Sequence, residues 1–374
     1  MNRPSLAGPM GGGSSLFAPT AALVMLAGRW LHWRYGHAWP APSGHAWGSD
    51  DAYITYRYTL NLWNGWGPVY NPGHAAVEGY SNPLYMFALV PLLALVGPDR
   101  LYDATVALNA VALLATVPLL ARLGTHLLPG WPIGQGLVLL LAAVFPPLWQ
   151  AAASGLETAI VYALQLALMT LILTPPIRHV EVVLAFVAAC LVAIRIDGFT
   201  LAGAVTVLLV LAGRWRSALS ILSGTTAMLV SLTLWRLSYY GLPLPNSVYA
   251  KVHGGWKARL AAAVKQAAFV LPSTGIVPWV LLPLFAVPRV LRSFAARGGV
   301  DLRAPEVLLA GVPLALTSYW FLVGGDVFFE RFLLLAYPLG LLVAFRALRI
   351  WRPAIAALVF TVLILNCVPL MSRA

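Results

Sequence analysis

The stretch ATVALNAVALLATVPLLA, residues 104–121, contains no charged residue. A helix of about 18 residues rises ~27 Å at 1.5 Å per residue, close to the ~30 Å hydrocarbon thickness of a bilayer. Other apolar runs are distributed along the whole chain, at residues 16–27, 83–97, 133–153, 157–173, 180–194, 199–213, 218–239, 275–288, 305–323, 332–345 and 353–370. The sequence therefore predicts an all-α polytopic membrane protein.

The overall composition supports this fold class. The 374 residues are 60% hydrophobic and 10% charged, and the mean hydropathy is +0.81, whereas soluble domains carry roughly 25% charged residues. A water-soluble globular protein is thereby excluded. The net charge of +12 comes from 24 Lys and Arg against 12 Asp and Glu. Because many of the arginines lie in short loops between apolar runs, we expect membrane lipids as their partners and no nucleic acid.

The basic loops also predict the orientation of the chain in the membrane. Arginines gather at residues 214–216, 289–303 and 346–352. Arg122 and Arg178 lie in loops that fall on the same side of the membrane when the predicted spans are counted. Loops rich in Arg face the cytoplasm, so most acidic residues are placed on the other, extracytoplasmic side. We expect a single domain over residues 1–374 with no separate soluble domain, in the plasma (inner) membrane, with its N-terminus inside and its C-terminus outside.

One apolar run, residues 82–97, is a weak candidate for a membrane span. It is interrupted by Pro91, and its length of about 15 residues reaches only ~23 Å as a helix. If it crossed, the loop at residues 34–82 would no longer be extracytoplasmic. We therefore predict a re-entrant or interfacial helix here, which leaves about eleven true spans.

The loop at residues 34–82 is the longest polar stretch, and loops on a rigid scaffold often carry function. Within it, Ser49 or Asp50 can cap a helix that runs to about Trp63 and ends at Gly65. Four large apolar residues of this helix share one amphipathic face: Tyr53, Tyr56, Leu60 and Trp63. The pattern predicts an interfacial helix that carries two acids at its start.

Asp50 and Asp51 are adjacent at the predicted helix N-terminus, where backbone N–H groups favour ionised carboxylates. One interpretation is that the pair only caps the helix. The other is that one acid is a general base and the second its partner, with a pKa tuned by partial desolvation and mutual repulsion. A carboxylate pair beside a lipid surface suits the activation of an alcohol, so Asp50 and Asp51 are candidate catalytic residues while the capping interpretation stays open.

Five stretches of the sequence resemble the GT-C superfamily of membrane glycosyltransferases, most closely the mycobacterial terminal arabinofuranosyltransferases and their relatives. They are DDAYITYRYTLNLWNGWGPVYNP at 50–72, EGYSNPLY at 78–85, SGLETA at 154–159, LPNSVYAKV at 244–252 and GGDVFFERFLLLAYPL at 324–339. The resemblance implies a GT-C-type transmembrane helix bundle. It also implies transfer of a sugar from a polyprenyl-phosphate donor to an extracytoplasmic hydroxyl, with Asp50 matching the catalytic base.

The departing polyprenyl phosphate needs a positive charge in a low-dielectric site. Arg331 and Lys251 are the preferred candidates, and Arg57 ranks below them; each also has a simpler reading as a surface or snorkelling cation. The remaining predicted substrate contacts lie in or beside the matching stretches: Glu78, Tyr80, Asn82, Asn246, Asp326 and Glu157.

Two acids near apolar runs have structural alternatives. Glu157 follows Ser154 with the S-x-x-E spacing of a capping box, so it is expected either to cap a helix or to contact substrate. Arg195 and Asp197 are expected to form an interfacial ion pair or to line the cavity.

No cofactor motif is present in the sequence. The histidines lack HxxxH and HExxH spacings, so no zinc site is predicted, and no P-loop or dinucleotide fingerprint is found. A divalent cation held by Asp50 or Asp51 with Glu78 or Asp326 is left open.

The resemblance implies an inverting glycosyltransferase that favours arabinofuranose or a similar pentose and uses a glycan, lipid or protein acceptor. The alternatives are a non-enzymatic polytopic transporter or lipid-linked-sugar flippase, and a non-catalytic subunit that binds the lipid-linked sugar. A transporter would more often place ionisable groups at mid-membrane.

Overall fold

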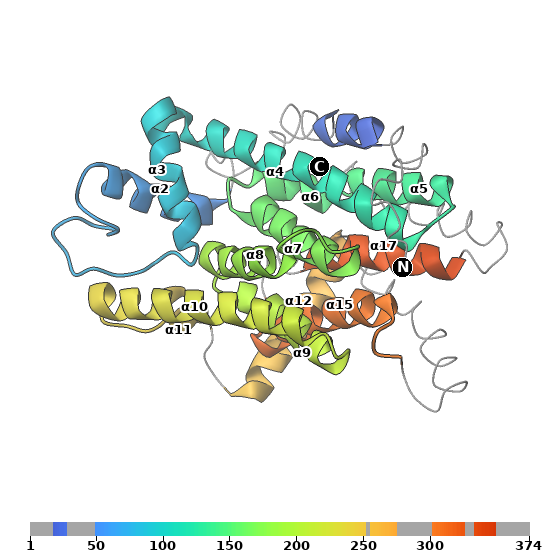
Figure 1. Ribbon diagram of the computed structural model, residues 1–374. Coiled ribbons are helices and arrows are strands. Elements are labelled where there is room, and N and C mark those ends of the chain that lie inside the picture. The colour runs from blue at the N-terminus through green and yellow to red at the C-terminus, as the bar shows by residue number, and fades with distance from the viewer. Residues whose placement is uncertain (1–17, 28–48, 252–254, 275–300, 326–332, 349–374) are drawn as a thin grey trace.

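The computed structural model describes residues 18–27, 49–251, 255–274, 301–325 and 333–348, and these form helices and connecting turns with no strand among them (Figure 1). After a first helix, Ala18–Ala27, the described elements are, in chain order, α2 (Asp50–Trp63), α3 (Pro83–Val96), η2 (Pro98–Arg100), α4 (Leu101–Leu127), α5 (Pro132–Ala143), α6 (Pro146–Ala153), α7 (Thr158–Leu173), α8 (Val180–Ile194), α9 (Gly198–Leu211), α10 (Trp215–Tyr240), α11 (Asn246–Lys251), α12 (Trp256–Thr274), α15 (Pro305–Leu322) and α17 (Ala336–Leu348). The predicted all-α class is confirmed for these residues.

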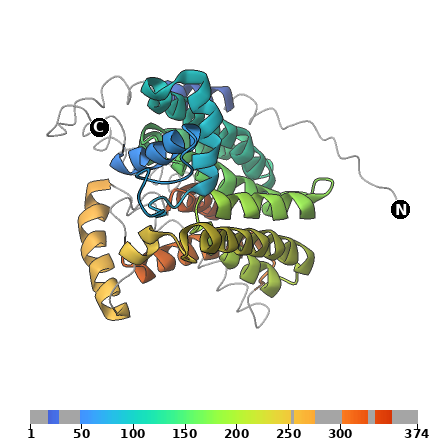
Figure 2. The same cartoon turned by 90° about the vertical axis from the view of Figure 1, so that its left-hand side faces the viewer.

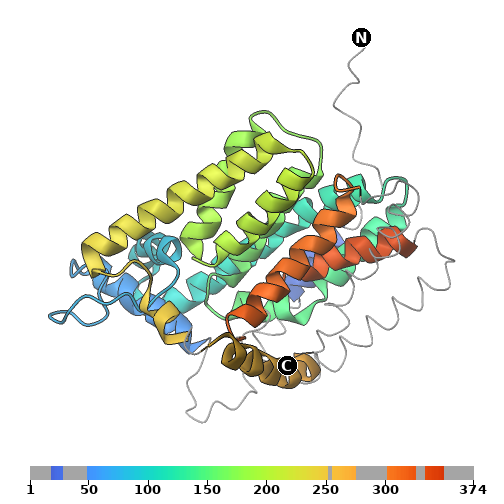
Figure 3. The same ribbon diagram turned by 90° about the horizontal axis from the view of Figure 1, so that it is seen from below.

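The long helices lie side by side as a bundle (Figures 1 and 3). Helix α10 packs along α8 and α9, α4 packs against α7, and α15 packs against α9 and α17. Gly224 of α10 faces the backbone of Ala185 in α8 so closely that an added Cβ would collide with the Ala185 carbonyl. Small residues allow such close approach of helices in membrane proteins.

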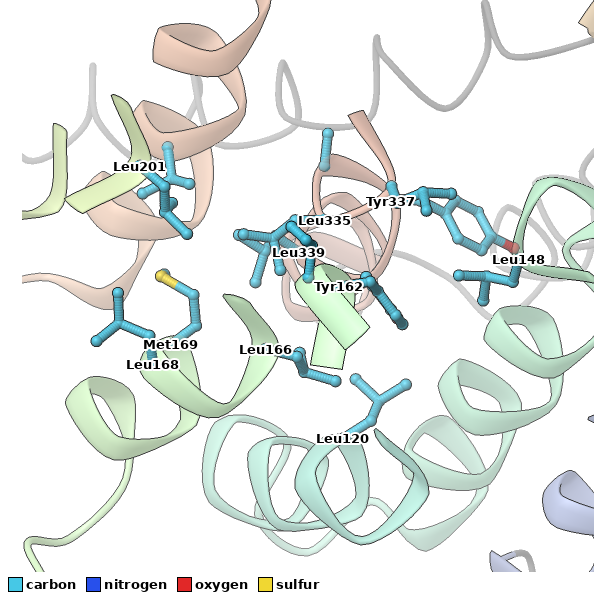
Figure 4. Packing of buried hydrophobic residues seen from close by; sticks show 14 of the residues in the cluster. Leu120, Leu148, Tyr162, Leu166, Leu168, Met169, Leu201, Leu335, Tyr337 and Leu339 are labelled. Carbon is cyan, nitrogen blue, oxygen red and sulfur yellow. The ribbon is translucent and has the colours of Figure 1, made fainter. Parts of the chain in front are cut away.

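The core of the bundle is made of large aliphatic and aromatic side chains from helices distant in sequence (Figure 4). Leu120 of α4, Leu166 of α7 and Leu201 of α9 are fully or almost fully buried there. Tyr337 of α17 stacks on Phe145 with ring centroids 3.9 Å apart. Its hydroxyl donates to the Leu141 carbonyl at 2.7 Å, near the bend between α5 and α6. The buried hydroxyl is thereby satisfied.

The outward faces of the bundle are apolar. Val182 and Phe186 of α8 are each 68% exposed, Leu234 of α10 is 62% exposed and Leu314 of α15 is 68% exposed. Exposed apolar side chains on several neighbouring helices are unfavourable in water and are expected on a surface that contacts lipid. The described helices therefore have the character of a membrane-embedded bundle.

Three described helices are long and apolar enough to cross a membrane: Pro98–Leu127, Trp215–Tyr240 and Pro305–Leu322. Helices α5 and α6 qualify together as one span with a bend of 47°. The other apolar helices, including Thr158–Leu173 and Val180–Ile194, are shorter than 18 residues. The predicted count of eleven spans is therefore not established by the described residues.

Helix α3 begins and ends at the same end of the bundle. Near its start, the Tyr85 hydroxyl donates to the Gly155 carbonyl at 2.9 Å. Just after it, at the start of α4, the Tyr102 hydroxyl donates to the Ala153 carbonyl at 2.7 Å. The helix runs across the long axis of α4 (Figure 1). The two ends of α3 therefore both lie near residues 153–155, as expected for a helix that does not cross the bundle.

The two ends of the bundle differ in charge. We call one the arginine end, where Arg122 bonds to Thr174 Oγ1, Arg214 to the Ile172 carbonyl and Arg346 to the Leu127 carbonyl. The other, which we call the acid end, holds α2, α3 and the N-termini of α7 and α9, where Glu157 and Asp197 lie (Figure 3). The common side predicted for Arg122, Arg214 and Arg346 agrees with this arrangement.

Candidate functional site at the acid end

The turn at residues 153–157, between α6 and α7, organises the acid end. Helix α6 ends at Ala153, and helices leave their last carbonyls without internal partners. Side chains from α2, α3 and α4 supply the missing donors: Tyr102 to the Ala153 carbonyl, Tyr56 and Tyr85 to the Gly155 carbonyl, and Asn109 to the Leu156 carbonyl. This turn therefore fixes the N-terminal helices in position.

Helix α2 starts at Asp50, as the sequence predicts, and its first residues lie against this turn. The Ser49 amide donates to the Ser154 carbonyl at 3.0 Å. The Ser49 side chain makes no capping hydrogen bond to the helix. Instead, Oδ1 of Asp50 accepts the Asp51 amide at 2.9 Å. The helix N-terminus thus lies at a fixed point beside the 153–157 turn.

The two acids differ in their surroundings. Asp50 is exposed and Asp51 is half-buried. Oδ2 of Asp50 bonds to none of the described residues, which leaves one carboxylate oxygen open to solvent or to a ligand. Both acids lie in the first turn of α2, where the helix leaves backbone N–H groups without internal acceptors. An exposed carboxylate with a fixed backbone and a free oxygen can accept a proton from a bound hydroxyl group.

The predicted apolar face of α2 is only partly buried. Tyr56 is 8% exposed, but Tyr53 and Trp63 are 47% and 53% exposed. The fully buried residues of α2 are mainly Thr55, Tyr58, Thr59 and Asn61, which hydrogen-bond to neighbouring segments. Helix α2 therefore turns hydrogen-bonding residues towards the protein and exposes aromatic rings, as an interfacial helix does.

The predicted capping box at Ser154 and Glu157 is wrong. Glu157 is the residue before α7, but its side chain makes no capping hydrogen bond, and Ser154 Oγ bonds to the Ala151 carbonyl and the Leu156 amide. Glu157 Oε2 instead accepts from Asn82 Nδ2 at 2.6 Å, and Oε1 pairs with Arg195 at 3.1 Å. The buried Glu157 carboxylate therefore accepts hydrogen bonds from an amide and a guanidinium group of segments distant in the sequence, and bonds from a charged donor are among the strongest.

The predicted ion pair between Arg195 and Asp197 is confirmed. Arg195 Nε and Nη2 donate to the two carboxylate oxygens of Asp197 at 2.9 and 2.7 Å, while Nη1 reaches Glu157. Asn82 also accepts Thr55 Oγ1 at 3.1 Å. A continuous polar network therefore joins α2, the start of α3, the start of α7 and the start of α9.

A second network contains an arginine that the sequence analysis did not select. Arg236 of α10 donates through Nε to both oxygens of Glu78, at 3.1 and 2.8 Å. The two side chains are only 1% and 2% exposed. Burial raises the pKa of the Glu78 carboxyl above its usual value, although the hydrogen bonds from Arg236 act in the opposite direction. The signal was present in the sequence, because an arginine within an apolar run requires a partner.

The segment around Glu78 is further fixed by backbone and aromatic contacts. The Asn246 amide donates to the Glu78 carbonyl at 3.0 Å. The hydroxyl of Tyr80 lies 3.0 Å from that of Tyr240, and the rings of Tyr80 and Tyr58 pack edge to face with centroids 4.6 Å apart. Burial is the main cause of the raised pKa of the Tyr80 hydroxyl. This group joins residues 78–80 to the ends of α10 and α11.

Of the predicted phosphate-binding cations, only Arg57 has a described side chain. It is exposed, and its Nε donates to the Tyr70 carbonyl at 3.2 Å. Lys251 ends α11, but its side chain is not among those described, and Asp326 and Arg331 lie outside the described residues. The structure therefore brings together Asp50, Asp51, Asn82 and Glu157 around one turn, and Glu78 and Tyr80 in the neighbouring cluster.

The described residues contain no group of three His, Cys, Asp or Glu side chains that could hold a metal ion. Glu78, the described residue that was considered as a ligand beside Asp50 or Asp51, is bonded to Arg236 instead.

Comparison with known proteins gives two curated relatives. The chain is 29% identical over 348 residues to a terminal beta-(1->2)-arabinofuranosyltransferase of Mycobacterium tuberculosis, and this match covers 86% of the chain. It is 28% identical over 336 residues to a protein of the same name from Corynebacterium glutamicum, over 77% of the chain. The chain resembles terminal arabinofuranosyltransferases. This confirms the predicted resemblance.

The match to these arabinofuranosyltransferases extends through most of the present chain but only through part of theirs. The chain spans about half the length of the relatives it matches, 54% of the mycobacterial protein and 46% of the corynebacterial one. No family model matches the chain. No solved structure matches it either.

Proposed function

We propose that this arabinofuranosyltransferase-like chain is a membrane glycosyltransferase of the GT-C type. It would move arabinofuranose, or a similar pentose, from a polyprenyl-phosphate donor to a hydroxyl group of a glycan, lipid or protein acceptor. The observation that carries the proposal is the similarity, along most of the chain, to two relatives named as arabinofuranosyltransferases.

Asp50 is the proposed general base. It takes the proton of the acceptor hydroxyl, the acceptor oxygen forms a bond to the anomeric carbon, and the bond from that carbon to the phosphate oxygen breaks. The bonding electrons leave with the polyprenyl phosphate, whose charge Arg331 or Lys251 stabilises. The exposed carboxylate of Asp50, whose Oδ2 has no partner among the described residues, supports this role. A single displacement of this kind inverts the anomeric centre.

The proposed location of the reaction is the extracytoplasmic surface of the plasma membrane. The acid end then faces outward and the arginine end faces the cytoplasm, in agreement with the positive-inside rule. A bundle of about eleven spans, with α3 as the re-entrant or interfacial helix, accounts for this orientation. The return of α3 to the 153–157 turn supports that part of the topology.

The positions of the buried ions favour an enzyme over a transporter. The described networks lie at helix ends: Glu157 precedes α7, Asp197 precedes α9, and Arg236 lies in the last turns of α10. A transporter places its ionisable binding residues near the middle of the membrane. The arrangement here suits a reaction at the membrane surface.

The experiment is to incubate the purified chain in lipid nanodiscs with a panel of polyprenyl-phosphoryl sugars and an acceptor oligosaccharide. We expect one pentose donor to be consumed, with release of polyprenyl phosphate and formation of a glycosylated acceptor. NMR of donor and product should show opposite anomeric configurations. Movement of lipid-linked sugar between leaflets of proteoliposomes without any transfer product would contradict the proposal and favour the flippase.

A further inference from the structure

Helix α12 is a basic helix at the edge of the bundle. It runs across the bundle axis (Figure 2) and packs against α15. Ala263 and Ala267 form its buried side. The sequence of α12, WKARLAAAVKQAAFVLPST, contains three basic residues and no acidic residue. Its electrostatic potential therefore favours an anion.

The end of α15 comes very close to this helix. Gly324 and Gly325 follow α15 with φ values of +97° and +81°, which glycine adopts more readily than other residues. A Cβ at Gly325 would collide with Gln266 Oε1 and would lie 3.2 Å from the Ala263 Cα, while one at Gly324 would lie 3.6 Å from the Arg259 Cβ. Arg259 and Gln266 thus both border the turn formed by these glycines.

Arg259 and Gln266 each bury a polar atom without a partner among the described residues. Nε of Arg259 and Oε1 of Gln266 are inaccessible to solvent and form no hydrogen bond within that part of the chain. By contrast, the Nε atoms of Arg195, Arg236 and Arg346 each donate to a carboxylate, and that of Arg122 donates to the Thr174 hydroxyl. A buried N–H without an acceptor is costly, so a ligand that supplies an acceptor would be stabilised here.

The turn at Gly324 and Gly325 lies at the acid end. Tyr319, in the last part of α15, packs edge to face on Phe199 of α9, with ring centroids 6.2 Å apart. Phe199 is in the first turn of α9, next to the Arg195–Asp197 pair. The residues around Gly324 and Gly325 are therefore at the same end of the bundle as Asp50.

We propose that Arg259, together with Gln266, binds the phosphate group of the lipid-linked donor. The assignment rests on the proposed function. A phosphate oxygen accepts the Nε–H of Arg259, and rotation of the Gln266 amide by 180° offers its NH₂ group as a second donor. Arg259 would hold the phosphate while the sugar is bound, and it would act beside Arg331 or Lys251 in balancing the charge that the phosphate gains when the sugar leaves.

The test measures binding of undecaprenyl phosphate to the full chain in zwitterionic nanodiscs by native mass spectrometry. Arg259→Gln should weaken binding about 10-fold or more, because a charge-assisted hydrogen bond is lost. Arg259→Lys should recover part of the affinity, since the charge remains but the planar fork is lost. Lys257→Gln is the matched control: it removes the same charge from an exposed position of the same helix and should change binding less than about twofold.

Gln266→Glu provides an independent variant. The new carboxylate would pair with Arg259 and compete with the phosphate, so binding should weaken although the volume of the side chain is unchanged. Thermal unfolding of each variant separates loss of binding from loss of folding. Equal binding by the wild type and a folded Arg259→Gln protein would overturn the assignment, as would an equal loss in Lys257→Gln.

Two further measurements, of pentose transfer and of binding to other anions, separate this inference from the proposed function and from general anion binding. If undecaprenyl phosphate binds through Arg259 but no pentose is transferred, the proposed function fails and the phosphate site stands. If transfer occurs with an unchanged donor KM in Arg259→Gln, the phosphate site fails and the function stands. Phosphatidylglycerol or inorganic phosphate bound with the same dependence on Arg259 would overturn the assignment to the donor.

Discussion

The arginine end and the acid end of the bundle use guanidinium groups in opposite ways. At the arginine end they bond mainly to backbone carbonyls at or just beyond helix C-termini: Arg122 to Pro175, Arg214 to Ile172 and Arg346 to Leu127. Cations at these positions satisfy carbonyls that lack partners and complement the helix dipole. At the acid end, Arg195 and Arg236 bond to carboxylates from segments distant in sequence.

The difference indicates different consequences of substitution. Arginines at the arginine end bond to carbonyls at the C-terminal ends of neighbouring helices, so their loss should affect stability and leave the geometry of the acid end unchanged. Arg195 and Arg236 instead hold loops that carry candidate substrate contacts, so their loss should change both stability and activity. Four experiments test the roles of the two ends.

The largest effect is expected at Asp50. Asp50→Asn removes the proposed base but keeps its shape, so kcat should fall by about 10²- to 10⁴-fold. The measurement is the initial rate of sugar transfer by purified protein. Asp103→Asn, a change at an exposed acid in the first turn of α4, should leave the rate within about twofold. An active Asp50→Asn enzyme would refute the assignment of the base.

Arg236→Ala should be the most destabilising of the ion-pair variants. It leaves the buried Glu78 carboxylate without its partner, and breaking a buried pair from one side costs about 3–5 kcal/mol. The midpoint of thermal unfolding in detergent should fall by much more than for Arg57→Ala, whose guanidinium is exposed. The double variant Glu78→Gln/Arg236→Met should recover part of the loss. Equal midpoints for Arg236→Ala and Arg57→Ala would contradict the buried pair.

Arg195→Gln and Arg346→Gln test the two ends directly. Each loses an ion pair in which the arginine side chain is 12% or 22% exposed, and each should lose about 1–3 kcal/mol of stability. Only Arg195→Gln should also lower transfer per folded molecule, by about 10-fold or more, because small displacements of a site reduce rates strongly. Similar rate losses in both variants would show that the ends do not differ in function.

Gly155→Ala should have the smallest effect of the four. Gly155 has φ +74°, and an added Cβ would collide with the Tyr56 hydroxyl and lie 3.2 Å from the Tyr102 ring. The strain should cost about 1–3 kcal/mol. Gly203→Ala is the control, because that helical glycine has open space around it and should gain up to about 1 kcal/mol. Opposite shifts of the unfolding midpoint are expected, and shifts in the same direction would argue against strain at the 153–157 turn.

Features set by neighbouring residues could be predicted from the sequence. The limits of α2 follow from the acids at its start and the glycines after its end, and they agree with the structure. The Arg195–Asp197 pair is likewise local, because the two residues are only two positions apart. The all-helical class follows from the length and apolar character of the runs.

Features set by distant residues could not be predicted in the same way. The spacing of Ser154 and Glu157 matches a capping box, but the real partners of Glu157 are Asn82 and Arg195, from other helices. Glu78 and Arg236 are 158 residues apart in the chain. The sequence shows that an arginine within an apolar run needs a counterion, but only the packing of the helices shows which acid supplies it.

The 153–157 turn has a consequence for biosynthesis. The ribosome completes α2, α3 and α4 before it adds Gly155 and Leu156, whose carbonyls these helices use. Protein domains fold as synthesis proceeds. Nascent chains that end before this turn lack the acceptors used by Tyr56, Tyr85 and Asn109. The first two helices after residue 49 must therefore wait for later translation before they reach their final places.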